Sequence, residues 1–192
     1  MDRDAADGGE PVVSPDRLRM WFSSERSGVG DIYTSLRATT SAPWQAPMPV
    51  TEINSAQQEE GFFVLPSQLV AYFHSERDGV DAPKICRTTR ATVDAPWGTP
   101  VRVGPTDGNY ENPFVTPDEC VMYVQVQRAS GSTDIEVMSR PTPTAPWGAP
   151  VKLGGVNTTG FDGDPFLSPD QRTLYYGTGA TFTVLEIWQA TR

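Results

Sequence analysis

Acidic residues stand just before each of four short apolar segments of the chain. They are Glu10, Glu60, Glu111 and, before the last segment, Asp162 and Asp164. If these segments converge at the mouth of a central channel, their carboxylates form a ring able to hold a cation or a basic group. The alternative is a set of solvated acidic loops that bind nothing. We predict Glu60, Glu111, Asp162 and Asp164 as candidate ligand-binding residues.

Paired carboxylates are also the catalytic groups of most glycoside hydrolases, where one acts as an acid and the other as a base or nucleophile. Glu60, Glu111 and Asp164 are the residues that would serve in such a reaction. The chain lacks the long substrate-binding loops that such an enzyme needs. We expect no catalytic residues, and we keep a carboxylate-based glycoside hydrolase as the alternative.

Residues with metal-binding or nucleophilic chemistry are few. His74 is the only histidine, and Ser23 and Gln125 take its place in other repeats, so neither a metal site nor a Ser-His-Asp triad is indicated. We expect His74 to be an ordinary strand-end residue, and we expect no cofactor and no metal. Cys86 and Cys120 fall at different points of their repeats. Such cysteines are usually buried as small hydrophobic residues, and a disulfide between these two remains an alternative.

An internal repeat organises the chain. The segment Ala-Pro-Trp occurs three times, and an arginine stands seven residues before each tryptophan: Arg37 and Trp44, Arg90 and Trp97, Arg140 and Trp147. Arg192 is the fourth arginine of this series. We expect the tryptophans to seal contacts between repeats rather than to stack on a ligand. The arginines are expected to pair with acids such as Asp31 and Asp134.

A proline corner recurs in the same way. The corners are Ser14-Pro15-Asp16, Leu65-Pro66-Ser67, Thr116-Pro117-Asp118 and Ser168-Pro169-Asp170, with prolines 51, 51 and 52 residues apart. Proline sets φ for the first turn position and Asp accepts a local hydrogen bond, which predicts a hairpin corner. Consecutive apolar residues follow each corner, as in a strand covered on both faces. A column of isoleucines then marks a third strand: Ile32, Ile85, Ile135 and Ile187.

These repeats predict an all-β fold, a β-propeller of about four antiparallel four-stranded blades with a period of about 51 residues. One domain is expected over residues 11–192, with blades at about 11–53, 54–107, 108–157 and 158–192, after a disordered acidic tail at 1–10. The last blade lacks its outer strand because no fourth Trp-x-x-Pro segment is present. Such an unfinished blade favours self-association. The other alternative is a fragment of a longer propeller without independent function.

The repeats resemble those of the WD-repeat-like (TolB-type, PD-repeat) bacterial β-propellers. Pro11–Asp16, Asp31–Tyr33 and Trp44–Pro47 match the family's Pro-x-x-Ser-Pro-Asp, Asp-Ile-Tyr and Trp-x-x-Pro segments. The resemblance implies a periplasmic or cell-surface binding or scaffolding protein, although the start of the chain lacks the layout of a secretory signal. The glycine that usually follows the corner is replaced, which predicts a different turn type; the replacements are Arg17, Gln68, Glu119 and Gln171.

The composition of the chain argues against two classes of partner, nucleic acids and membranes. The net charge of −9 argues against nucleic acid, and no stretch approaches the roughly 18 apolar residues that membrane insertion requires. The repeats differ most in the loops that lead from each outer strand to the next inner strand. Asn54, Asp107 and Asn157 hold matching positions there and suggest an Asx-type turn. We therefore predict a non-catalytic module that recognises a protein or a polysaccharide through this loop rim.

Overall fold

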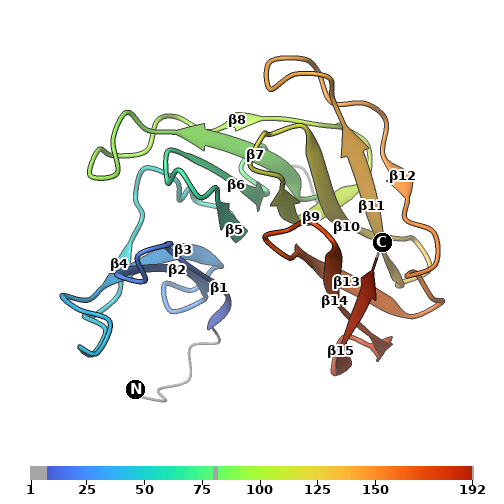
Figure 1. The fold of residues 1–192 in the computed structure, drawn as a ribbon, viewed down its shortest axis with the longest axis horizontal. Coiled ribbons are helices and arrows are strands. Elements are labelled where there is room, and N and C mark those ends of the chain that lie inside the picture. Colours follow the sequence, from blue (N-terminus) through green and yellow to red (C-terminus); the bar gives the residue numbers. More distant parts are fainter. Residues whose placement is uncertain (1–7, 80–81, 192) are drawn as a thin grey trace. The chain divides into compact units, whose positions relative to one another are not determined.

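The computed structural model describes residues 8–79 and 82–191, and strands are the only regular elements in them. The strands form four separate antiparallel sheets, which are the predicted blades of a β-propeller (Figure 1). Each strand follows its sequence neighbour, so every blade is a simple meander. Within the described ranges, no helix is long and apolar enough to cross a bilayer.

The first three blades have four strands each and the last has three, which confirms the predicted fold class. Blade 1 contains β1 (Gly8–Val13), β2 (Arg19–Ser24), β3 (Asp31–Leu36) and β4 (Met48–Pro49). Blade 2 contains β5 (Glu59–Val64), β6 (Val70–Ser75), β7 (Lys84–Thr89) and β8 (Val101–Arg102). Blade 3 contains β9 (Asn109–Val115), β10 (Val121–Gln127), β11 (Thr133–Ser139) and β12 (Val151–Lys152). Blade 4 contains β13 (Phe161–Leu167), β14 (Thr173–Thr181) and β15 (Val184–Thr191).

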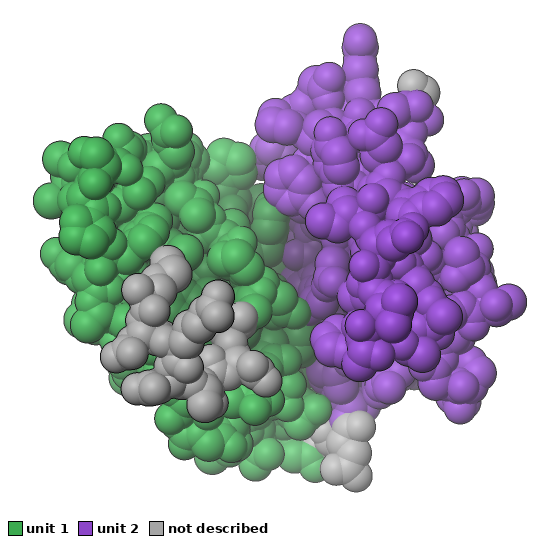
Figure 2. Space-filling view, turned by 90° about the horizontal axis from the view of Figure 1, so that it is seen from below, with its two compact units in different colours: residues 1–81, 86–102 green, residues 82–85, 103–192 purple. Residues whose placement is uncertain are grey.

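The chain groups into two compact units (Figure 2). Unit 1 comprises residues 1–81 and 86–102, which hold blade 1 and most of blade 2. Unit 2 comprises residues 82–85 and 103–192, which hold blades 3 and 4 together with the first residues of β7. Because β1 starts at Gly8, residues 8–10 belong to a strand, whereas the sequence placed them in the acidic tail. The rest of that predicted tail, residues 1–7, lies outside the described residues.

The proline corners join the first and second strands of every blade. At the first corner the Ser14 hydroxyl donates to the Asp16 carboxylate over 2.6 Å, and that carboxylate accepts from the Leu18 amide over 2.9 Å. The residue after each corner has a positive φ of 55° to 60°; these residues are Arg17, Gln68, Glu119 and Gln171. The expected change of turn type is therefore wrong. These side chains adopt the left-handed conformation that glycine normally supplies.

The repeated arginines brace the same corners. Each guanidinium lies over the indole that follows it, 4.3 Å away for Arg37 and Arg90 and 4.1 Å for Arg140. Each Nε also donates to the carbonyl of a left-handed corner residue: Arg37 to Arg17, Arg90 to Gln68 and Arg140 to Glu119. In the first three blades, corners and arginine–tryptophan stacks thus lie at the same end of the sheet. The β2–β3-type hairpins and the loops to the next blade lie at the other end, which we call the loop end.

The expected pairing of these arginines with Asp31 and Asp134 is wrong. Asp134 accepts from Arg128 over 2.7 Å and pairs with Lys152 at 2.7 Å. Asp31 accepts a short hydrogen bond from the Ser27 hydroxyl. Both aspartates therefore hold the loop end, whereas the arginines hold the opposite end. Arg192 lies outside the described residues.

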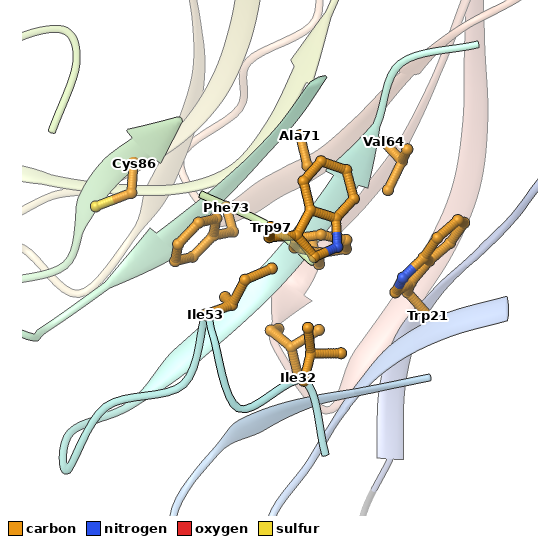
Figure 3. Close-up of a cluster of buried hydrophobic side chains, with 10 residues drawn as sticks. Trp21, Ile32, Ile53, Val64, Ala71, Phe73, Cys86 and Trp97 are labelled. Carbon is orange, nitrogen blue, oxygen red and sulfur yellow. The ribbon is translucent and has the colours of Figure 1, made fainter. Parts of the chain in front are cut away.

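Apolar side chains of blades 1 and 2 form the core of unit 1. Figure 3 shows Trp21, Ile32 and Phe73 gathered with Trp97, and all four are at most 6% exposed. Trp21 of blade 1 packs on Phe62 of blade 2 with ring centroids 6.2 Å apart, and Trp97 meets Phe62 edge-on at 5.7 Å. The second strands β6 and β10 are buried over nearly their whole length, as the consecutive apolar residues predicted.

Candidate functional site

A bulge interrupts the inner strand of every blade near its loop end. Beside the bulge, one residue of the inner strand pairs with one residue of the second strand, and we call the inner-strand member of this pair the rung residue. The pairs are Gly9 with Ser23, Glu60 with His74, Glu111 with Gln125, and Gly163 with Gly177. The next inner-strand residue has a positive φ of 47° to 64°: Glu10, Gly61, Asn112 and Asp164. In each blade, either the rung residue or the bulge residue that follows it therefore carries a carboxylate. These acids lie inside the inner strands, whereas the sequence predicted them just before the strands.

In blade 1 the carboxylate is on the bulge. Glu10 accepts from the Ser23 hydroxyl over 3.0 Å and from the Gly61 amide of blade 2 over 2.6 Å. Burial raises the pKa of Glu10, while the nearby His74 and these hydrogen bonds act in the opposite direction. Glu10 thus links two neighbouring inner strands.

In blade 2 the carboxylate is on the rung. Glu60 lies 3.7 Å from the His74 ring and accepts from the Gln58 amide over 2.7 Å. The hydrogen bond with His74 is the main reason that the pKa of Glu60 lies below its ordinary value. His74 is the next-to-last residue of β6, close to the strand end as predicted, and at 5% exposed it is a buried partner of Glu60.

In unit 2, blade 3 has its carboxylate on the rung and blade 4 on the bulge. Glu111 accepts from the Gln125 side-chain amide over 2.7 Å, and Asp164 accepts from the Asn112 amide over 2.5 Å. Among the predicted acids, Glu60 and Glu111 are therefore half-buried, and Asp164 is exposed.

Asp162 differs from the other predicted acids because it is fully buried. Its carboxylate accepts from the Thr178 hydroxyl over 2.6 Å and from the Thr158 hydroxyl over 2.8 Å. Glu59 holds the same place in blade 2, where it accepts from Ser55 and Ser75 and is also fully buried. Asp162 and Glu59 therefore fasten the loop that leads into their blade, and neither offers an exposed oxygen to a ligand. Glu59 was not predicted as a functional residue from the sequence.

The rim asparagines bond to the third strand of the preceding blade. Asn54 accepts from the Ile32 amide over 2.8 Å and donates to its carbonyl over 3.0 Å, and Asn157 does the same with Ile135 over 2.7 and 2.9 Å. The side chains extend the β-ladder instead of closing the expected Asx-type turn. Asp107 at the third rim position is exposed.

A pocket of about 460 Å³ opens at the loop end of unit 2. Its polar wall contains Glu111 and Gln125, and Gln125 is 5% exposed with its Oε1 lacking a hydrogen-bond partner among the described residues. Its apolar wall contains Phe161 and Phe182, whose rings meet at 5.6 Å and 65°. The rim is completed by hydroxyl and glycine residues: Ser130, Gly131, Ser132, Thr133, Thr159 and Gly160.

Gly163 makes room for the buried amide of this pocket. A Cβ at position 163 would lie 2.0 Å from Gln125 Oε1, which is closer than any real contact. Glycine on the rung of blade 4 therefore allows Gln125 of blade 3 to keep its place. Residues 159 and 160 belong to the loop rim that the sequence predicted as a binding surface. The 128–132 hairpin and Phe182 were not predicted to be part of a binding site.

The remaining chemistry in the described residues is limited. No group of three or more His, Cys, Asp or Glu side chains in residues 8–79 and 82–191 is placed to hold a metal ion. Cys86 and Cys120 are both free thiols, and Cys86 is buried whereas Cys120 is partly exposed. Burial raises the pKa of Cys86 to about 11.

Comparisons with known proteins extend the fold assignment. No family model and no curated protein matches this chain. Among structures, TolB from Acinetobacter baumannii is 18% identical with a TM-score of 0.62, and the match covers 95% of this chain and 40% of TolB. A putative TolB from Agrobacterium tumefaciens is 15% identical with a TM-score of 0.66, covering 97% of this chain and 61% of the other. The fold is that of a TolB-type β-propeller.

Other solved structures are also similar in fold to this chain. An α-L-arabinofuranosidase from Podospora anserina, determined in complex with cellotriose, is 14% identical with a TM-score of 0.59. The match covers 99% of this chain and 67% of the arabinofuranosidase. This chain spans about half the length of the two TolB structures, and at these identities the likeness concerns the fold alone.

Proposed function

We propose that this TolB-type propeller is a non-catalytic binding module whose unit 2 pocket takes a polyhydroxylated ligand, such as part of a polysaccharide. The observation that carries the proposal is the pocket with Glu111 and Gln125 on one wall and the Phe161–Phe182 pair on the other. Carboxylate and amide oxygens accept hydrogen bonds from sugar hydroxyls, and aromatic faces pack on the apolar faces of sugar rings.

The volume and composition of the pocket fit such a ligand. At about 460 Å³ it lies within the range of small-molecule sites, which combine apolar walls with a few placed polar groups. The Gln125 side-chain amide donates to Glu111 over 2.7 Å, which holds the Glu111 carboxylate in the wall of the pocket. One similar structure, the arabinofuranosidase, was determined with cellotriose, so this fold is able to hold an oligosaccharide.

Binding rather than hydrolysis is favoured by the acids around the pocket. A glycoside hydrolase needs two carboxyl groups that flank the scissile bond. Glu111 is the one carboxylate that lines the pocket among the described residues, and the nearby Asp162 is fully buried in hydrogen bonds to threonines. A periplasmic or cell-surface location, which the family resemblance implies, belongs to the same proposal.

The test is a binding screen of the purified chain against neutral oligosaccharides, followed by calorimetry on any that bind. We expect Glu111→Gln and Phe182→Ala to weaken binding at least about tenfold each, because the first removes the negative charge of a hydrogen-bond acceptor and the second removes an aromatic ring from the apolar wall. Glu119→Gln and Val151→Ala are the matched controls. Glu119 lies at the opposite end, where blade 2 already carries Gln68, and Val151 is exposed on β12.

Three results would overturn the proposal. One is that no oligosaccharide binds and that the pocket binds a protein ligand instead. Another is unchanged affinity in both pocket variants. The third is hydrolysis of chromogenic glycosides that Glu111→Gln abolishes, which would establish the glycoside hydrolase instead.

A further inference from the structure

A further pocket lies between blades 1 and 2, and all of its lining residues belong to unit 1. Its volume is about 430 Å³, and it shares no residue with the pocket of unit 2. Blade 1 contributes Arg19 and Trp21 to the wall, and blade 2 contributes Arg90 and Trp97. Both tryptophans belong to the buried cluster of Figure 3, so the pocket has a well-packed base.

Arg90 is a buried cation of this pocket, and its outer nitrogens are unpaired. The residue is 7% exposed, and its Nε donates to the Gln68 carbonyl over 2.7 Å. Neither Nη1 nor the buried Nη2 has a hydrogen-bond partner among the described residues. In blade 3 the Nη2 of the equivalent Arg140 lies 3.5 Å from the Glu119 carboxylate. Gln68 takes the place of Glu119 in blade 2, which explains why Arg90 has no such acid.

The unpaired nitrogens of Arg90 favour an anion in the pocket. Burial, with a smaller contribution from the charge of Arg19, lowers the pKa of Arg90 to about 10, so the guanidinium stays protonated at neutral pH. A buried charge without a partner is costly. Because Nε is engaged by Gln68, the edge formed by Nη1 and Nη2 is left to bind the two oxygens of a carboxylate.

The other charges around the pocket favour a ligand group with a single negative charge. Arg19 adds a second positive charge, whereas the equivalent residues of the other blades are Val70, Val121 and Thr173. Arg19 Nη2 lies 3.7 Å from the Asp94 carboxylate, but the Asp94 side chain is 88% exposed, so this pair is weak. Glu52, the other acid of the lining, is exposed. Two arginines beside two acids suit a carboxylate better than a doubly charged phosphate.

Apolar side chains continue the wall next to these charges. Met48 is 51% exposed, and Pro49 and Pro96 are exposed as well. They offer a surface on which the apolar part of a ligand can pack. We propose that this pocket binds a monocarboxylate with an apolar body, whose carboxylate is held by Arg90 and Arg19.

The test is a titration of the ¹⁵N-labelled full chain with benzoate at constant ionic strength, followed through the arginine Nε–H resonances. The hydrogen bond to Gln68 slows exchange of the Arg90 Nε proton, which keeps its signal observable. We expect benzoate to shift this signal to saturation. Benzamide has the same shape without the charge and should leave the signal unchanged.

The carboxylate could belong to a free acid or to the end of a peptide, and N-acetylphenylalanine distinguishes these sources. Tighter binding than benzoate would identify a peptide carboxyl terminus, and weaker binding would identify a free acid. Both results support the proposed carboxylate site.

Two substitutions should change the affinity for benzoate in opposite directions. Arg19→Gln should raise the dissociation constant about tenfold, because it removes a charged donor. Asp94→Asn should lower it about twofold, because it removes a competing negative charge. Arg90→Gln should abolish binding. If circular dichroism shows that the Arg90 variant does not fold, the first two variants decide.

Arg37→Gln is the matched control, because Arg37 lies over Trp44 as Arg90 lies over Trp97 but does not line the pocket. It should bind benzoate like the parent chain. Equal shifts with benzoate and benzamide would overturn the proposal. Unchanged affinity in Arg19→Gln would also overturn it, as would tighter binding of inorganic phosphate than of benzoate at pH 8.

Discussion

The Glu10 carboxylate accepts a hydrogen bond of 2.6 Å from the Gly61 amide, 51 positions further along the chain. Both residues are the left-handed bulge residues of their inner strands, with φ of 54° and 64°. In unit 2 the equivalent residues Asn112 and Asp164 bond through their side chains over 2.5 Å. Neighbouring blades of each unit are therefore joined at their bulges, where the ladder hydrogen bonds are interrupted.

Replacing Glu10 by alanine should destabilise the chain. The change leaves the Gly61 amide and the Ser23 hydroxyl without their acceptor, and an unsatisfied buried group costs about 1–3 kcal/mol. The free energy of unfolding from urea titration measures the loss. Glu25→Ala, at an exposed position of the β2–β3 hairpin, is the control and should change stability by less than about 0.5 kcal/mol. Equal effects of the two variants would remove any special role for the bulge contact.

The stability contributions of Glu10 and Glu60 should depend on pH in opposite directions. The pKa of Glu10 is raised above 4.5 in the folded chain, so its contribution is complete below that value and is lost as the pH rises through the folded pKa. The pKa of Glu60 is lowered below 4.5, so its contribution is present above that value and is lost as the pH falls. Urea titrations of Glu10→Gln and Glu60→Gln between pH 3 and 7 measure both. Parallel pH profiles would contradict the assignment.

Glycine at the left-handed corner position should stabilise the chain. Gln171 has φ of 59°, and a residue with a Cβ pays a conformational cost there that glycine avoids. We expect Gln171→Gly to raise the free energy of unfolding by about 0.5–1 kcal/mol. Arg172→Gly, one residue later and outside the positive-φ set, should lower it by a similar amount because the unfolded chain gains freedom. A loss in both variants would show that the corner is not strained.

The two thiols should react at different rates. Cys120 is partly exposed, whereas Cys86 is buried and its pKa is raised to about 11, so almost no thiolate forms at neutral pH. A chromogenic disulfide reagent should label one thiol of the native chain rapidly and the second only in denaturant. Cys120→Ser should abolish the rapid phase. Rapid labelling of two thiols in the native chain would contradict the buried position of Cys86.

The arginine–tryptophan stacks should contribute unequally. Arg140 is 9% exposed, lies over Trp147 and donates to the carbonyls of Glu119 and Ala145. We expect Arg140→Ala to cost about 2–3 kcal/mol of unfolding free energy. Arg37→Ala should cost about 1 kcal/mol, because Arg37 is more exposed. Equal losses in thermal or urea unfolding would show that burial does not set the contribution.

The sequence predicted the fold because the repeats are local signals. Each corner proline, each Ala-Pro-Trp segment and each isoleucine of the third strand marks a fixed point of a blade. Ile32, Ile85 and Ile135 are at most 1% exposed, as a covered third strand requires. Ile187 keeps the pattern but is 86% exposed, because exposure depends on a neighbouring blade and not on the residue itself.

The candidate site was harder to predict because a bulge moves residues out of register. Glu10 was aligned with Glu60 and Glu111, yet its structural counterparts are Gly61, Asn112 and Asp164, all of which stand five residues before a corner proline. Counting back from that proline would have found the match. The contact between His74 and Glu60 joins two strands, and nothing in the local sequence of either residue indicates it.

The division between the two ends of each blade has a consequence for protein engineering. Corners and arginine–tryptophan stacks secure one end of blade 3, and the ion pair of Arg128 with Asp134 secures the loop end, so the exposed residues 129–131 at the tip of the hairpin lie outside the contacts that hold the strands in register. That hairpin is a natural place to graft a foreign peptide. Exchanging the hairpins between blades would likewise give variants that differ in their loop-end surface and keep the same strands.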